Sequence, residues 1–116
     1  MTADRERNVA EDLRRYFAYR LPARVSEIEA ARDAARDAGW GLEPLRTVHR
    51  LAHSLSGAGA TFGFPEVSVL SRRLEGLLKG ALDGGSPPEA AEIEGLLSRL
   101  RDLAGHPPDT EAGASP

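Results

Sequence analysis

The chain has 116 residues, of which 41% are hydrophobic and 28% are charged, and its net charge is −3. A chain of this length forms one domain with a modest core and has no room for a nucleotide-binding kinase module beside it. The negative net charge argues against nucleic acid as the main ligand. With no cysteine, disulfides and thiolate metal sites are excluded. The sequence shows neither a leader-like start nor an apolar run of about 18 residues, so we expect a cytoplasmic protein without a membrane span.

The first third of the chain predicts two helices separated at a proline. Apolar residues at helical spacing run from Val9 to Tyr19 and again from Ala23 to Ala38. Because proline interrupts a helix and suits a first turn, we expect a short first helix, with Pro22 opening the second and Gly39 ending it. We expect Trp40, in the connector that follows, to close one end of the core.

The middle of the chain predicts a pair of helices joined by a short turn. The third predicted helix begins near Glu43 or Pro44 and ends near Phe62, where Gly63 breaks it; the fourth covers Pro65–Leu82. On a helical wheel, the buried face of the third helix consists of apolar or small residues: Leu45, Val48, Leu51, Ala52, Leu55, Gly59 and Phe62.

The last third predicts a loop, one helix and a tail. Residues 83–88, D-G-G-S-P-P, form a loop by composition, and a fifth helix follows over Glu89–Leu103. We expect residues 1–104 to form the domain and 105–116 to be a disordered tail or a linker stub. Helices without alternating strands predict an all-α, up-and-down four-helix bundle with a short additional N-terminal helix.

His53 is the most informative residue in the sequence, because it lies about 140° from the middle of the apolar face of its helix. A glycine inside a helix is less stable than alanine by roughly 1 kcal/mol, and this helix has two. Gly59 lies on the apolar face, where it lets another helix approach. Gly57 lies on the side of His53, where a larger side chain would block access to the imidazole. The predicted neighbours of His53 are mostly small or polar: His49, Ser56, Gly57 and Ala60.

The segment H-S-L-S-G-A-G-A-T-F-G-F, residues 53–64, resembles the signature of histidine-containing phosphotransfer (HPt) domains. It is most similar to the phosphotransfer domain of chemotaxis-type histidine kinases. The resemblance implies a phosphoryl-accepting histidine at His53, a hydrophobic residue at Leu55, and glycines at Gly57 and Gly63.

The resemblance also implies that Glu75, on the next helix, orients His53. Such a carboxylate would hold a proton on Nδ1 and leave Nε2 free to attack phosphorus. An alternative is that Glu75 is a solvated residue paired with Lys79, four residues later. The family usually has a lysine, which helps to stabilise the phosphoryl charge, at the position where this chain has Ser56. Arg72 is our first candidate to supply the positive charge of the missing lysine.

His49 and two arginines precede His53 on its side of the helix. His49 is a rival acceptor, and with His53 it forms an i, i+4 pair of the kind that binds metal, but no third ligand is evident and we predict no metal site. Arg46 and Arg50 either form a solvated face or, with Arg72, attract the acidic pocket of a partner.

We therefore expect a histidine phosphotransfer protein of a two-component phosphorelay, a phosphoryl carrier and not an enzyme. It would exchange the group with an aspartate of a response-regulator receiver domain. Its partners would be such a receiver domain, a histidine kinase, or both. We expect a monomer that binds no cofactor of its own, the partner supplying Mg²⁺, with neither nucleic acid nor membrane as a partner. The alternatives are an adaptor that binds a receiver without phosphorylation, and the excised N-terminal domain of a chemotaxis-type kinase.

Overall fold

The computed structural model describes the backbone of residues 2–105 and the side chains from residue 8 onward, and this part of the chain contains helices and no strand. Of the predicted tail, Gly105 is the last residue of α4, and residues 106–116 lie outside the described residues. The fold is an all-α four-helix bundle, as the sequence predicted. Its helices are α1 (Thr2–Asp37), α2 (Leu42–Thr61), α3 (Pro65–Gly84) and α4 (Ala90–Gly105).

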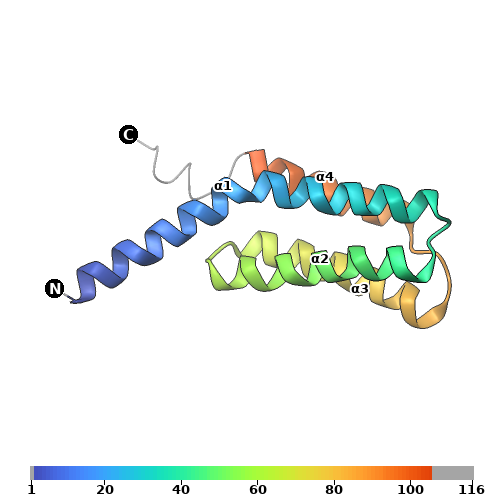
Figure 1. The fold of residues 1–116 in the computed structure, drawn as a ribbon, viewed down its shortest axis with the longest axis horizontal. Helices are drawn as coiled ribbons and strands as arrows, with labels where there is room; N and C mark the ends of the chain where they lie inside the picture. Colours follow the sequence, from blue (N-terminus) through green and yellow to red (C-terminus); the bar gives the residue numbers. More distant parts are fainter. Residues whose placement is uncertain (1, 106–116) are drawn as a thin grey trace.

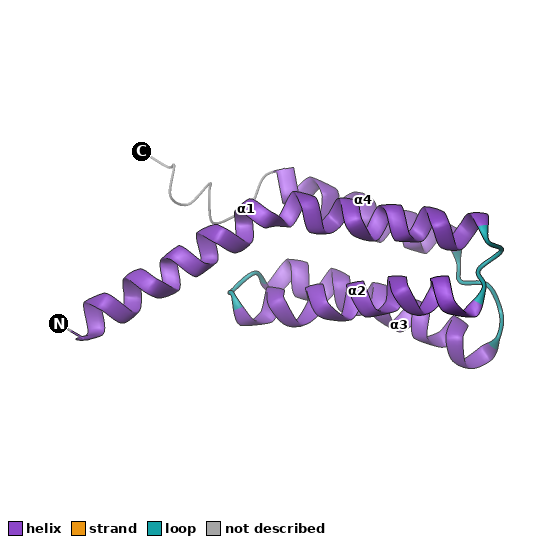
Figure 2. Cartoon of the chain, viewed as in Figure 1, coloured by secondary structure: helices purple, strands orange, loops and turns teal. Residues whose placement is uncertain are grey.

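The helices run up and down in chain order (Figures 1 and 2). Each helix packs against the next one along the chain, and α4 returns to pack against α1. Figure 1 shows two layers, one of α1 and α4 and the other of α2 and α3. The α2–α3 layer carries the residues that the sequence singled out.

The predicted break at Pro22 is wrong, because Pro22 lies inside the single helix α1. Proline in a helix interior removes a backbone hydrogen bond and costs about 3 kcal/mol. Leu21 and Val25, on either side of it, are 0% and 2% exposed, and burying two such side chains contributes about 3–6 kcal/mol, which outweighs that cost. Pro22 itself is exposed, and α1 changes direction near its middle (Figure 1).

The segment predicted as a separate first helix contacts the bundle near its C-terminal end, where Phe17 and Ala18 are buried and Nε of Arg14 donates to the carbonyl of Phe62 at 3.2 Å. Phe17 is buried and its ring stacks on Phe62, with 5.5 Å between the ring centroids. Val9, Leu13 and Tyr16, which belong to the apolar residues at helical spacing in this segment, are exposed. The described side chains before Phe17 therefore add little to the core.

The predicted apolar face of α2 is confirmed in the core. Leu45, Val48, Ala52, Leu55 and Gly59 are buried, whereas Leu51 and Phe62 are half-buried against the core. Trp40 also packs against the core, as expected for a residue that closes its end.

The α2–α3 hairpin is tight because two glycines permit close backbone approach. A Cβ on Gly59 would lie 3.0 Å from the backbone nitrogen of Ser68, so α3 passes directly against this residue. Gly63 has φ +81°, which a residue with a side chain rarely adopts. The amide of Phe64 then donates to the carbonyl of Gly59 at 2.8 Å. Together these contacts set how α2 and α3 face each other.

Charged side chains tie the other two helices together. Arg32 of α1 is buried, and it pairs with Asp33 at 2.6 Å and with Glu94 of α4. Arg101 of α4 pairs with Glu29 of α1. The pairs Arg32–Glu94 and Arg101–Glu29 join α1 to α4 and leave the outer face of the α2–α3 layer uninvolved.

Candidate functional site

An imidazole and a carboxylate meet on the surface between α2 and α3. Nδ1 of His53 lies 2.7 Å from Oε2 of Glu75, and the side chains are 71% and 21% exposed. A carboxylate only accepts hydrogen bonds, so the proton of this bond is carried by Nδ1. The lone pair of the neutral ring then resides on Nε2, which no hydrogen bond engages within the described part of the chain.

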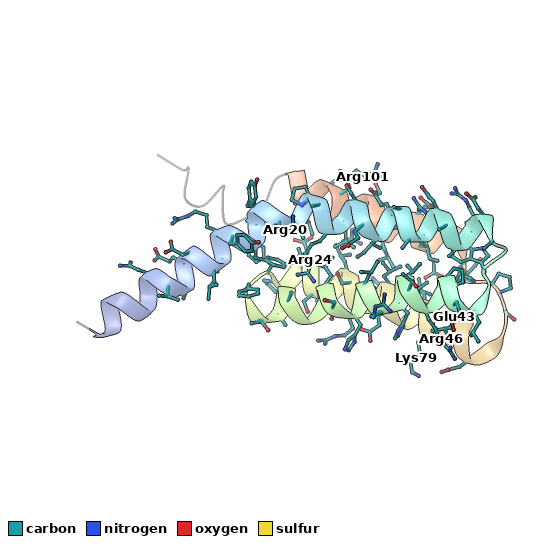
Figure 3. All side chains as sticks on the ribbon, in the orientation of Figure 1. Arg20, Arg24, Glu43, Arg46, Lys79 and Arg101 are labelled. Carbon is teal, nitrogen blue, oxygen red and sulfur yellow. The ribbon has the colours of Figure 1, made fainter. Side chains whose placement is uncertain are left out.

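The pair faces away from α1 and α4. Figure 3 shows Arg46 of α2 and Lys79 of α3 projecting from the side of their layer that is remote from the other two helices. His53 follows Arg46 by seven residues, or about two helical turns, and Glu75 precedes Lys79 by four, or about one turn. Both residues of the pair therefore lie on this outer face.

His49 lies one turn before His53 and is only half-buried, with a side chain 26% exposed. The two rings are nearly parallel, at 13°, with centroids 6.5 Å apart. Nε2 of His49 is buried, has no hydrogen-bond partner, and lies 3.9 Å from Oε2 of Glu75. This nitrogen is directed to the carboxylate and away from solvent, which favours His53 over His49 as the accessible nucleophile.

The surface beyond His53 on α2 is open. Gly57 is exposed, and a Cβ added to it would have no atom within 4 Å. Ala60 is also exposed, so His53, Gly57 and Ala60 form a stripe of one imidazole and two small residues. Ser56, by contrast, is only 5% exposed. The prediction that Ser56 lies on the accessible surface beside His53 is wrong, because α2 packs closely enough on α3 to bury this position.

The basic residues around the pair differ in their partners. Arg46 is paired with Glu43 at 2.9 Å. Arg50 and Arg72 are exposed, and within the described residues neither forms an ion pair. Lys79 pairs with Asp83 at 3.2 Å. The alternative in which Glu75 is a surface residue paired with Lys79 is therefore not what the structure shows.

Sequence reasoning missed one exposed aliphatic residue near this surface. Val69 is 56% exposed although it lies in a helix that buries Val67 and Leu70. It directly follows Ser68, which Gly59 touches, so Val69 lies near the same end of the α2–α3 pair as Ala60. Its position out of phase with the apolar face of α3 was the available signal.

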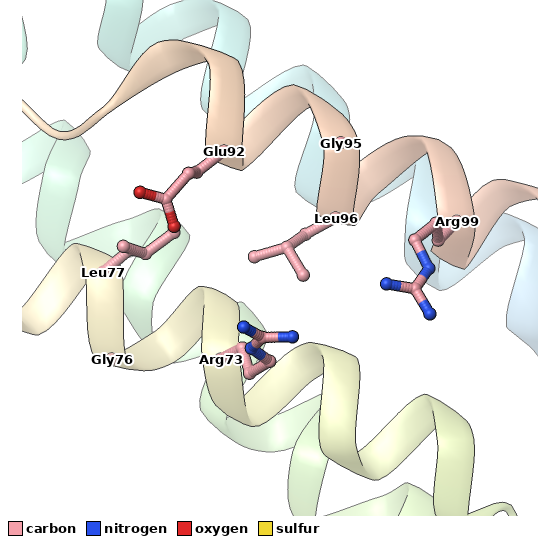
Figure 4. Close-up of a pocket in the computed structure, with 7 residues that line it drawn as sticks. All are labelled: Arg73, Gly76, Leu77, Glu92, Gly95, Leu96 and Arg99. Carbon is pink, nitrogen blue, oxygen red and sulfur yellow. The ribbon is translucent and has the colours of Figure 1, made fainter.

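A groove between α3 and α4 lies on a different side of α3 (Figure 4). Its volume is about 480 Å³, Leu96 lies at its centre, and Arg73 and Arg99 flank it. Neither His53 nor Glu75 contributes to it. The imidazole is thus presented on open surface, where another protein can reach it, and not inside this groove.

Two further observations concern the described residues alone. No described helix combines the length and apolar character needed to cross a membrane. Among the side chains that the structure describes, no group of three or more His, Cys, Asp or Glu residues is placed to hold a metal ion.

Comparison with known proteins agrees with this arrangement of a histidine on a helical bundle. The sequence model of the Hpt domain family matches residues 12–104, and the chain therefore belongs to the Hpt domain family. Hpt domains are phosphoryl carrier modules that take part in phosphorelays with histidine kinases and receiver domains. This confirms the resemblance drawn from residues 53–64.

A second match agrees with the chemotaxis-type character of the motif. The chemotaxis protein CheA of Klebsiella aerogenes is 48% identical to this chain over 40 residues, which is 34% of this chain and 6% of that protein. The chain thus matches only a small part of this relative's length. No solved structure matches the chain.

Proposed function

We propose that this chain carries a phosphoryl group on Nε2 of His53 and exchanges it with the aspartate of a response-regulator receiver domain. The supporting observation is the 2.7 Å contact of Nδ1 with Glu75 on a ring that is otherwise exposed. This contact selects the tautomer whose free lone pair is on Nε2 and also fixes the orientation of the ring.

The transfer step needs little from this chain beyond a well-placed nucleophile. Nε2 attacks the phosphorus of an aspartyl phosphate, the P–N bond forms, and the P–O bond to the aspartate breaks, releasing its carboxylate. The Nδ1 proton stays in place, so the phosphorylated ring gains positive charge beside Glu75. A negative charge already at hydrogen-bond distance stabilises the charge that develops in the transition state. The reverse transfer follows the same path.

We propose that the partner supplies Mg²⁺. Magnesium requires a nearly octahedral set of oxygen ligands, mostly carboxylates, phosphates and waters. At this site the carboxylate of Glu75 is already engaged by His53. The role left to this chain is to present the imidazole to a metal-loaded receiver.

We propose that the partner docks over the stripe formed by His53, Gly57 and Ala60, with Arg46, His49, Arg50 and Arg72 at its edge. The small residues let a protein surface approach the ring closely, since space above Gly57 is open. Arg50 and Arg72 have no ion-pair partners within the described residues and are available to an acidic pocket. Such charges raise the association rate, and salt weakens their effect. Arg72 also takes the place of the family's lysine in offsetting phosphoryl charge.

The test is phosphotransfer with the purified chain against the kinases and phosphorylated receivers of its source organism. The third histidine of the sequence, His106, provides a matched control. We expect acid-labile phosphate on the wild-type chain and on His106→Gln, but none on His53→Gln, which should fold normally because the position is exposed. Phosphate on His53→Gln would place the acceptor elsewhere. A wild-type chain that binds a receiver but never becomes labelled would instead support the adaptor function.

A further inference from the structure

A second imidazole is directed at the carboxylate oxygen that holds His53. Oε2 of Glu75 accepts the hydrogen bond from Nδ1 of His53, and the same oxygen lies 3.9 Å from Nε2 of His49. Nε2 of His49 is buried and has no hydrogen-bond partner, which is uncommon for a buried polar atom. The carboxylate is therefore the natural acceptor for a proton on that nitrogen.

Electrostatics decides which nitrogen of a neutral His49 carries the proton. With the proton on Nδ1, the lone pair on Nε2 would face a carboxylate away from water, and the two would repel each other. With the proton on Nε2, the same geometry becomes attractive. His49 and His53 should accordingly be opposite tautomers, with His49 protonated on Nε2 and His53 on Nδ1.

We propose that His49 is a positioning residue, which acts on the phosphoacceptor through Glu75. A carboxylate oxygen has two lone pairs, so Oε2 can accept from both imidazoles. The present 3.9 Å exceeds hydrogen-bond length, and a small rotation within the flexible Glu75 side chain closes it. Held from two sides, the carboxylate keeps the rotamer that receives Nδ1–H of His53.

The parallel arrangement of the rings supports this role. Their planes differ by 13° and their centroids are 6.5 Å apart, as follows from their placement one turn apart on α2. From neighbouring positions on α2, Nδ1 of His53 lies 2.7 Å and Nε2 of His49 lies 3.9 Å from the same oxygen of Glu75. The inference rests on the proposed function, because it assigns a positioning role in the transfer to His53.

Two substitutions at position 49 separate hydrogen bonding from packing. His49→Phe keeps a flat ring but removes the donor, whereas His49→Gln removes the ring and restores an N–H group at a similar reach. We expect His49→Phe to slow phosphorylation of His53 by roughly three- to tenfold, the range of one hydrogen bond. His49→Gln should recover most of that rate. Thermal unfolding of both variants establishes that they are folded.

Nitrogen-15 NMR of the imidazoles, at an alkaline pH where they are neutral, gives a readout that does not depend on phosphotransfer. In the wild type we expect His49 to be protonated on Nε2 and His53 on Nδ1. In His49→Phe the Nδ1–H fraction of His53 should fall, and in His49→Gln it should return.

The inference and the proposed function fail in different ways. His49 protonated on Nδ1 in the wild type would overturn the inference, as would a His53 tautomer and transfer rate unchanged in His49→Phe. Equal losses in His49→Phe and His49→Gln would also overturn it, because they would show that packing alone matters. A wild-type chain that accepts no phosphoryl group would refute the proposed function, and the NMR spectra would still decide the hydrogen bonding of His49.

Discussion

Replacing Gly59 by alanine should destabilise the bundle, whereas the same change at Gly57, two residues earlier, should stabilise it. A Cβ on Gly59 would lie 3.0 Å from the nitrogen of Ser68 and 3.3 Å from the carbonyl oxygen of Phe64, both of them backbone atoms that cannot rotate away. Such overpacking costs about 1–3 kcal/mol, against a gain of about 1 kcal/mol from the better helix former. At Gly57 a Cβ meets no atom within 4 Å, so the gain remains unopposed.

These magnitudes convert into measurable shifts of the unfolding temperature. A change of 1 kcal/mol moves Tm by about 4–8 °C in a domain of this size. We expect Gly59→Ala to unfold about 4–8 °C below the wild type and Gly57→Ala to unfold above it by a similar amount. Circular dichroism melts, with urea titrations as a second measure of stability, test this pair. Shifts of the same sign and size in both variants would refute the close contact between Gly59 and α3.

Two further predictions concern access to the imidazole and its orientation. Gly57→Leu should be at least as stable as the wild type but should transfer phosphoryl groups much more slowly, because leucine would occupy the open approach to His53. Transfer assays beside melting curves check this, and an unchanged rate would show that Gly57 does not serve access. Glu75→Ala should slow phosphorylation by roughly ten- to a hundredfold without abolishing it, since Nε2 survives while its orienting partner is lost. Single-turnover kinetics measure this, with Glu75→Gln as the uncharged control of similar size; wild-type rates in both variants would remove Glu75 from the site.

The sequence pointed to Glu75 only through the resemblance to the Hpt family, and the position of the turn explains why His53 and Glu75 meet. Helical periodicity predicted α2 and α3, and Gly63 with Pro65, two residues later, marked the tight turn between them. His53 lies nine residues before Phe62 and Glu75 lies ten after Pro65, so the two are almost equally far from the turn. In an antiparallel pair of helices such positions are neighbours.

The continuation of α1 through Pro22 and the burial of Ser56 could not be predicted, because both depend on how the helices pack against one another. Whether Pro22 ends a helix depends on how much apolar surface its neighbours bury, and that becomes known only when the other helices are placed. The burial of Ser56 depends on how closely α2 approaches α3, which the contact of Gly59 with Ser68 determines.

The short hairpin has a consequence for how this site can vary among related sequences. His53 and Glu75 are 22 residues apart, with only residues 62–64 between their helices. One residue inserted in α3 before Glu75 would rotate everything beyond it by about 100° and move it by about 1.5 Å, carrying the carboxylate away from the ring. The contact between the two side chains thus depends on the number of residues that separate them, whereas the connectors at 38–41 and 85–89 lie outside that interval.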